Sequence, residues 1–149
     1  MNRRRLPSFC IGALLPIAMC GIGETAYGAS EIKGAAILDH PCGKVAVKQV
    51  GLVHAGNFDE ANKLSTKEMQ EQWKAMPAKD RTEMSGLAKA MSPTQEQFTA
   101  AVKAGGVLVV DGPSATLTTT TTTKDANGSS TETTTQKFRV TGSECLVSR

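Results

Sequence analysis

The sequence lacks an apolar run long enough to form a permanent transmembrane helix. Its most apolar stretch lies between Phe9 and Ile22 and is interrupted by Pro16. A helix that crosses a bilayer needs roughly 20 apolar residues, because the hydrocarbon layer is about 30 Å thick. We therefore expect no permanent transmembrane segment.

The same stretch has the three-part pattern of a secretory signal peptide. Three arginines precede it, and small and polar residues follow it. Signal peptidase requires small side chains one and three residues before the cut. Residues 1–28 are therefore predicted to be a signal peptide, with cleavage after Gly28 or Ser30, and the expected location is the periplasm or the outside of the cell.

Two other leader types are alternatives. Cys20 lies where a lipoprotein would be lipidated, although Met19 stands where that motif requires a small residue. Arg3 and Arg4 resemble part of a twin-arginine signal, but Pro7 interrupts the hydrophobic pair expected there. General secretion remains the prediction.

The chain also lacks an excess of charge of either sign. Its 17 Lys and Arg and its 14 Asp and Glu give a net charge of +3 at pH 7. Three arginines and Glu24 lie in the predicted leader, which leaves a mature net charge of +1. This balance gives no electrostatic basis for binding nucleic acid or an anionic membrane. We expect a linker over residues 29–40 and a single domain over residues 41–149.

Cysteines are few, and only Cys42 and Cys145 remain after removal of the leader. Two cysteines in an exported protein favour one disulfide. It would close a loop of about 100 residues, for which chain entropy predicts roughly 4 to 5 kcal/mol of stabilisation. Two free thiols are the alternative. A metal site with His40 and His54 is disfavoured, because no pair has a standard zinc spacing, and no cofactor is expected.

Helix start and stop signals fill the region from residue 41 to residue 105. A first helix is expected from Pro41 to the residue before Gly56, because proline suits a first helical position and glycine a stop. Its valines and Gly51 leave a buried strand as an alternative. Apolar periodicity predicts further helices over residues 57–64, 65–76, 78–91 and 92–104.

Start signals of the capping type precede three of these helices. In a capping box, two side chains three residues apart each bond the backbone amide of the other. The pairs with this spacing are Asn57 with Glu60, Ser65 with Glu68, and Ser92 with Gln95.

Methionine and aromatic residues recur on one side of two predicted helices. Stripes of this kind usually belong to the core, so we expect both to be buried. They are Met69, Trp73 and Met76 on one helix, and Met84, Leu87, Ala88 and Met91 on the next.

Threonine dominates the segment from Thr116 to Val140. Threonine is β-branched and favours an extended backbone, and Asn127-Gly128 is typical of a two-residue hairpin turn. We therefore predict a long two-stranded ribbon, preceded by a short buried strand within residues 105–113. A disordered or glycosylated stalk is the alternative, because Asn127 also begins a glycosylation sequence.

The turn position sets the expected register of the ribbon. With Asn127-Gly128 at the turn, Leu117 lies opposite Phe138, and Ala115 lies opposite Val140. These apolar residues then share one face with Thr119, Thr121 and Thr123, while basic residues and the other threonines share the opposite face.

Helices followed by antiparallel strands predict an α+β fold, with N-terminal helices packed on a curved antiparallel sheet and a long Thr-rich C-terminal hairpin. The segment AVKQVGLVHAGNFDEANKLST, residues 46–66, resembles the opening of small exported bacterial proteins of unknown function. These belong to the nuclear transport factor two-like superfamily, with cystatin-like and ketosteroid isomerase-like members. The order of elements extends the likeness from Cys42 to Val147.

The resemblance implies a cone-shaped fold, in which helices and a concave sheet can enclose a pocket. Some relatives place Asp, His or Tyr inside the cone for proton transfer, whereas many exported relatives have no enzymatic role. This chain departs from the enzymatic pattern, because its one tyrosine, Tyr27, lies in the predicted leader.

No residue is predicted to be catalytic. Asp111 is the one acid in an apolar strand run, but it starts an Asp-Gly-Pro turn sequence. His54 lies near the end of the first helix, where a positive charge suits the helix dipole, and His40 lies in an expected loop. The sequence shows no legible Ser-His-Asp or Cys-His spacing and no phosphate-binding glycine loop.

The sequence thus predicts an exported, non-enzymatic domain that binds a small apolar ligand or a protein partner. One alternative is a lyase or isomerase of the ketosteroid isomerase-like type, which requires a buried acid or histidine inside the cone. Another is a partner-binding module that uses the edge of the Thr-rich hairpin. The residues expected to line the pocket are Phe58, Trp73, Phe98 and Phe138.

Overall fold

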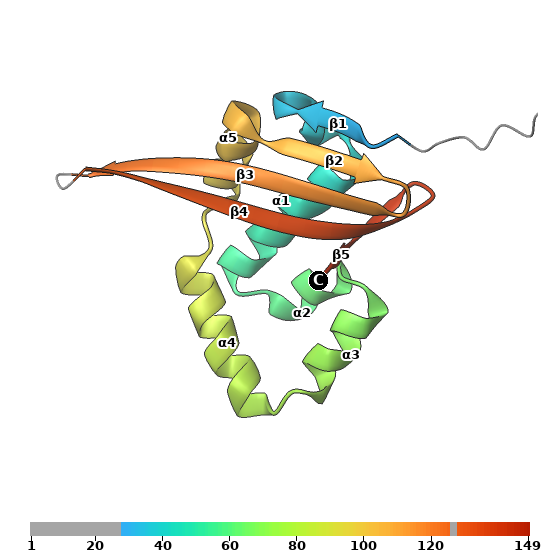
Figure 1. The fold of residues 1–149 in the computed structure, drawn as a ribbon. Coiled ribbons are helices and arrows are strands. Elements are labelled where there is room, and N and C mark those ends of the chain that lie inside the picture. Colours follow the sequence, from blue (N-terminus) through green and yellow to red (C-terminus); the bar gives the residue numbers. More distant parts are fainter. Residues whose placement is uncertain (1–27, 126–127) are drawn as a thin grey trace, which may run out of the picture.

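The computed structural model describes residues 28–125 and 128–149 (Figure 1). The predicted signal peptide lies outside this description up to residue 27, and so do the residues of its lipoprotein and twin-arginine alternatives and Asn127. Of the helices described, none combines the length and the apolar character needed to cross a bilayer.

Helices and an antiparallel sheet form the described part of the chain, which confirms the predicted α+β class. Along the chain, all the described helices come after the first strand and before the second. In chain order the elements are β1 (Ser30–Lys33), the 3-10 helix η1 (Gly34–Asp39), α1 (Pro41–Ala55), α2 (Phe58–Lys63), α3 (Lys67–Ala75), α4 (Ala78–Met91), α5 (Gln95–Gly105), β2 (Val107–Asp111), β3 (Ser114–Asp125), β4 (Gly128–Thr141) and β5 (Glu144–Ser148).

The first long helix begins and ends where the sequence predicts. Pro41 is its first residue, and Nδ1 of His40 accepts a hydrogen bond from the Cys42 amide at 3.2 Å. Gly56 ends the helix with φ of 85°, in the left-handed region that glycine adopts without strain. The alternative of a buried strand is therefore wrong for this segment.

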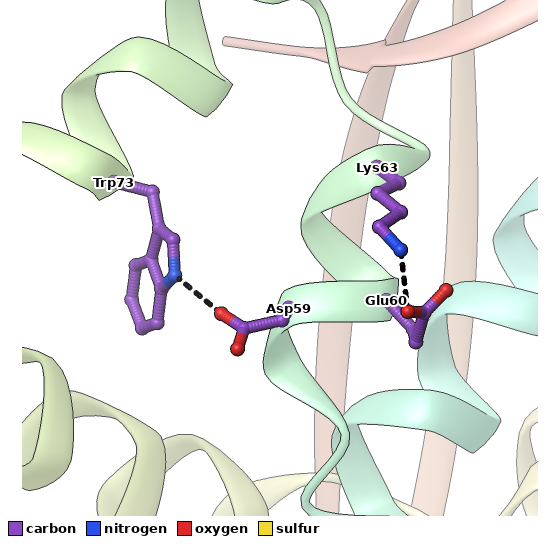
Figure 2. A network of polar contacts seen from close by, with 4 residues as sticks. All are labelled: Asp59, Glu60, Lys63 and Trp73. Atoms are coloured by element: carbon purple, nitrogen blue, oxygen red, sulfur yellow. Dashed lines mark hydrogen bonds and ion pairs between the residues drawn. The ribbon is translucent and has the colours of Figure 1, made fainter.

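The starts of α2 and α3 do not use the predicted capping pairs. The side chain of Asn57 makes no cap hydrogen bond, and Glu60 instead accepts one from Lys63 Nζ at 2.5 Å (Figure 2). The residue that precedes α3 is Thr66 rather than Ser65. Capping requires an extended backbone at the cap residue, whereas Asn57 has φ of −90° and ψ of 63°.

The third start signal is displaced by two residues. Thr94, not Ser92, caps α5, and it forms a reciprocal capping box with Gln97 through bonds of 3.1 and 2.9 Å. Ser92 with Gln95 and Thr94 with Gln97 have the same three-residue spacing. The backbone path after α4 therefore decides which of the two pairs caps α5.

The predicted linker, residues 29–40, is structured. Within it, β1 pairs with β2 so that Ile32 lies opposite Leu108. Ile37 in η1 is completely buried, and the Gly34 amide donates to the Gly106 carbonyl at 3.0 Å. The segment belongs to the domain because these isoleucines extend the core, although too few residues separate them to show a periodic pattern.

The sheet is an antiparallel meander with strand order β1-β2-β3-β4-β5. Asp111 ends β2 opposite Ser114 across a short turn at Gly112, which places it at the turn that the sequence predicts. The last strand, β5, is also bridged by the segment between α2 and α3, because Thr66 N donates to Val147 O at 2.9 Å.

The two threonine-rich strands pair with each other, but in a register two residues away from the predicted one. Ala115 lies opposite Phe138, and Leu117 lies opposite Gln136. A shift by an even number of residues leaves the same side chains on the same face. The pairing sets the large ring of Phe138 against the small side chain of Ala115, and the Gln136 amide donates a hydrogen bond to Gln49 on α1.

The core lies between one face of the sheet and the helices α1 and α5. α1 contacts β4 and β5, and α5 contacts β3 and η1. Burying apolar side chains from both layers supplies the main driving force for folding. The buried residues that form this cluster are Ile37, Cys42, Ala46, Phe98, Val102, Leu108, Ala115, Leu117, Phe138, Cys145 and Val147.

The disulfide predicted between Cys42 and Cys145 is present, with 5.0 Å between the two Cα atoms. Cys42 lies in the first turn of α1, and Cys145 lies in β5 opposite Val140. Both side chains are buried, so the bond joins the helical layer to the sheet through the core.

The apolar stripe of α4 is exposed, contrary to the prediction. The exposed fractions are 52% for Met84, 63% for Leu87 and 75% for Met91, and neither α3 nor α4 contains a buried residue. In Figure 1 these two helices lie on the far side of α2 from the sheet. Helical periodicity shows which residues share a face, but another element must cover that face to bury it.

Candidate functional site

The four aromatic residues predicted to line one pocket lie in different environments. Phe98 and Phe138 belong to the buried core, with exposed fractions of 7% and 1%. Phe58 and Trp73 are partly exposed and lie outside that core. The structure therefore does not bring the four rings together, and the pair Phe58 and Trp73 marks a separate site.

This site is a groove between α2, α3 and α4, which we call the helical groove. It is an open groove with a volume of about 520 Å³. Its lining residues come from all three helices, together with the glycine that ends α1. The lining residues are Gly56, Phe58, Asp59, Trp73, Ala78, Arg81, Thr82, Ser85, Gly86 and Lys89.

One wall of the helical groove is aromatic. The rings of Phe58 and Trp73 are stacked, with 6.3 Å between their centroids and 25° between their planes. Trp73 Nε1 donates a hydrogen bond to Asp59 Oδ1 at 3.3 Å (Figure 2). The indole is thus held by a neighbouring ring and by a carboxylate, which leaves the site with an ordered apolar surface.

The opposite wall is cationic. Arg81 and Lys89 lie two turns apart on α4, with Ser85 between them. Among the ion pairs found in the described part of the chain, none involves Arg81 or Lys89. Arg81 Nε is enclosed without a hydrogen-bond partner, a situation that costs about 1–3 kcal/mol for a buried donor.

Charge in the groove is therefore unbalanced. Asp59 is the one acidic lining residue, against Arg81 and Lys89. A site with two cations and one carboxylate favours a ligand that carries a negative charge.

Other hollows of similar size lack this combination. A hollow of about 620 Å³ between α1 and α5 is lined by aliphatic and polar side chains and by the lysines Lys44 and Lys48, but it contains no aromatic ring. A hollow of about 520 Å³ beside Phe138 contains Arg139, but Arg139 donates to Glu68 at 3.4 Å. Only the helical groove joins stacked rings to unpaired cations within the described residues.

The two histidines occupy opposite ends of α1. Nδ1 of His54 lies 3.1 Å from the Ser92 carbonyl oxygen, beside the start of α5. His40 lies at the N-terminal end beside the disulfide, and burial lowers the pKa of its imidazole below the ordinary value. Neither histidine lines the helical groove.

Sequence reasoning missed Arg81 and Lys89. The signal was present, because residues 81, 85 and 89 follow a helical period of four and therefore share a face. The apolar stripe of α4 gives the stronger periodic pattern in the same residues. The structure shows the polar face turned toward α2 and α3, while Met84, Leu87 and Met91 are exposed.

Comparison with protein-family models, with curated proteins and with solved structures finds no match to this chain.

Proposed function

We propose that this protein is an exported, non-enzymatic binding domain that holds a small aromatic carboxylate in the helical groove. The observation that carries the proposal is the pairing of a stacked ring wall with a wall of two unpaired cations in one groove. A ligand with a planar ring and a carboxylate meets both walls at once.

The ring wall supports an aromatic ligand. Stacked or edge-on contacts between rings add about 0.5–1.5 kcal/mol to the free energy of apolar burial. Trp73 is held by Phe58 and Asp59 before any ligand binds, so little side-chain entropy is lost on binding.

The cationic wall supports an anionic group. A guanidinium presents several donors in a fixed plane that matches a carboxylate, and such charge-assisted bonds are stronger than neutral ones. Arg81 has no acceptor for its Nε, and Lys89 has no ion pair in the described part of the chain. A bound carboxylate offsets the electrostatic cost of holding both cations in one groove.

Export is supported by two independent features. The sequence has the pattern of a signal peptide over residues 1–28, and the domain contains a buried disulfide, a bond that persists in oxidising compartments. We also retain the relationship to the nuclear transport factor two-like superfamily, with helices packed on a curved sheet. An antiparallel meander beside a helical layer supports it.

Binding can be followed at the one tryptophan of the chain, Trp73. We expect 1-naphthoate to shift the Trp73 indole resonance saturably in proton–nitrogen NMR spectra. The neutral isostere 1-naphthalenemethanol should bind at least about tenfold more weakly, because it forms no charge-assisted bond. Arg81→Gln and Lys89→Gln should each weaken naphthoate binding by a similar factor.

Lys79→Gln is the matched control, because Lys79 lies on the same helix but is paired with Glu83 at 3.8 Å and does not line the groove. Its affinity for naphthoate should equal that of the wild type. Absence of a saturable shift with naphthoate would refute the binding site. Equal affinity for the acid and the alcohol would refute the role of the cations while keeping the ring wall.

A second candidate function is self-association through the edge of the Thr-rich hairpin. β2 pairs with β3 only as far as Thr118, so residues 119–125 pair with β4 alone among the described strands. The residues from Thr119 to Thr123 are uncharged and include no proline, and the charged residues of this segment, Lys124 and Asp125, lie at its end. An uncharged edge without proline offers pairing groups to another strand, and an antiparallel second copy offers the same sequence.

Shortening the hairpin tests this function. Replacing residues 121–132 with Asn-Gly leaves Thr120 opposite Thr133 across a two-residue turn. We expect the wild type to form a dimer in sedimentation experiments and the shortened variant to remain monomeric with an unchanged melting temperature. A wild type that stays monomeric at its solubility limit, or a shortened variant that still dimerises, would contradict this function.

A further inference from the structure

A cluster of three metal-ligand side chains lies in the core, away from the helical groove. The ligand atoms of His40, Cys42 and Cys145 all lie within 4.8 Å of one another. Cys42 is fully buried and Cys145 is 5% exposed, while His40 is partly buried. In the structure the two sulfur atoms are joined as the disulfide.

The start of α1 explains why the imidazole lies beside the sulfur atoms. Pro41 begins the helix, which places His40 at the cap and Cys42 in the first turn. Nδ1 of His40 accepts the Cys42 amide proton at 3.2 Å. This bond places the proton of the neutral imidazole on Nε2, so a metal ion would bind the lone pair of Nδ1 by displacing the Cys42 amide from it.

The partner cysteine comes from the sheet. Cys145 lies opposite Val140 in the pairing of β4 with β5, and the Thr66 and Leu64 backbone bonds to Val147 hold the other side of β5. Both ends of the disulfide are thus anchored in ordered elements, so a folded reduced protein is expected to keep the sulfur atoms close to His40.

We propose that this cluster is a redox-gated metal site that binds a thiophilic cation, Zn²⁺ or Cu⁺, when the disulfide is reduced. A dithiol reductant transfers two electrons and two protons to the disulfide, which yields two cysteine thiols and leaves the reductant as its own disulfide. The cation then displaces both thiol protons and binds two thiolates and one imidazole. The oxidised protein has no thiolate and does not bind.

The donor set matches this class of cation. Two thiolates and an imidazole are soft and borderline ligands, which suit Cu⁺ and Zn²⁺ rather than Mg²⁺ or Ca²⁺. Three protein ligands satisfy a three-coordinate Cu⁺, and they leave one position for a small molecule on a tetrahedral Zn²⁺. His54 contributes nothing, because it lies at the opposite end of α1 beside Ser92.

Cobalt absorption tests the site on the whole mature protein. After reduction with a phosphine under argon, we expect Co²⁺ to produce a thiolate-to-cobalt charge-transfer band at one equivalent, and Zn²⁺ to remove it. The oxidised protein should show no band. Cys145→Ser should abolish the band, and His40→Ala should weaken Co²⁺ binding at least tenfold.

His54→Ala is the matched control, and its affinity for Co²⁺ should equal that of the wild type. Far-UV circular dichroism monitors folding in every sample. If the reduced apoprotein unfolds, refolding driven by Zn²⁺ in the wild type but not in His40→Ala supports the site. Absence of the band, a band that does not depend on His40, or failure of Zn²⁺ to refold an unfolded reduced chain would overturn the proposal.

Discussion

Replacing Cys145 with alanine should lower the free energy of unfolding by about 4 kcal/mol or more. The disulfide joins residues separated by 103 positions, so its loss returns a large amount of conformational freedom to the unfolded chain. The substitution also removes a buried sulfur atom that packs between α1 and β5, which adds a cavity term. Urea denaturation of the oxidised wild type and the variant measures the difference.

The cross-link and the packing can be separated with three further samples. The samples are Cys42→Ala, the double variant Cys42→Ala/Cys145→Ala and reduced wild type. Each single substitution already removes the one disulfide, so the loss of unfolding free energy in the double variant should be far smaller than the sum of the losses in the two single variants. Reduced wild type reports the cross-link alone, since both sulfur atoms remain. Additive losses, or a reduced wild type as stable as the oxidised one, would contradict the assignment to chain entropy.

Replacing Gly43 with alanine should destabilise the protein by about 3 kcal/mol, although alanine is normally the better helix former. Gly43 lies in α1 against η1, and an added Cβ would lie 1.8 Å from the Ile37 carbonyl oxygen and 2.9 Å from Ile37 Cγ2. Ile37 is completely buried, so neither its backbone nor its side chain has room to move. Thermal denaturation should show a large fall in the melting temperature of the variant relative to the wild type.

Gly86→Ala provides the matched control for this substitution. Gly86 lies in the middle of α4, and no atom lies within 4 Å of the position its Cβ would take. The substitution should therefore raise stability by about 0.5–1 kcal/mol, the difference in helix propensity. A Gly43→Ala variant as stable as the wild type would show that η1 does not pack against α1 as described.

Local chemistry made parts of the fold predictable. The limits of α1 follow from Pro41 and Gly56, because proline and glycine restrict the backbone wherever they occur. The pairing of Cys42 with Cys145 follows from the two cysteines that lie outside the predicted leader. Alternation along β3 and β4 placed Leu117 and Phe138 on the buried face, since side chains of a strand alternate whatever its neighbours are.

Features that depend on contacts between distant residues were not predictable. The register differed by two residues, because parity fixes the face but only packing sets which residue lies opposite Phe138. The sequence predicts a linker where β1 and η1 lie, because their isoleucines are recognisable as core residues only when β2 and α1 lie beside them. Met84, Leu87 and Met91 on α4 are exposed because none of the elements that the structure describes covers them.

The candidate site likewise combines features that local sequence predicts with features that depend on contacts between distant residues. The sequence predicts that Phe58 and Trp73 line a pocket, because both lie on apolar helix faces. It predicts the same pocket for Phe98 and Phe138, but these two rings are buried in the core against the sheet. Arg81 and Lys89 became part of the site only because α4 turns their face toward α2 and α3. His40 likewise joins the two cysteines only because β5 brings Cys145 to the start of α1.

By itself, the sequence determined the α+β class, the limits of the first helix, the faces of the threonine-rich strands and the cysteine pair, because each depends on residues close in the chain or few in number. The tertiary structure alone decided the register, the exposed side of α4, the aromatic and cationic groove, and the cluster at the disulfide. These depend on which surfaces pack together, and that choice is made by the burial of the whole core rather than by any local pattern.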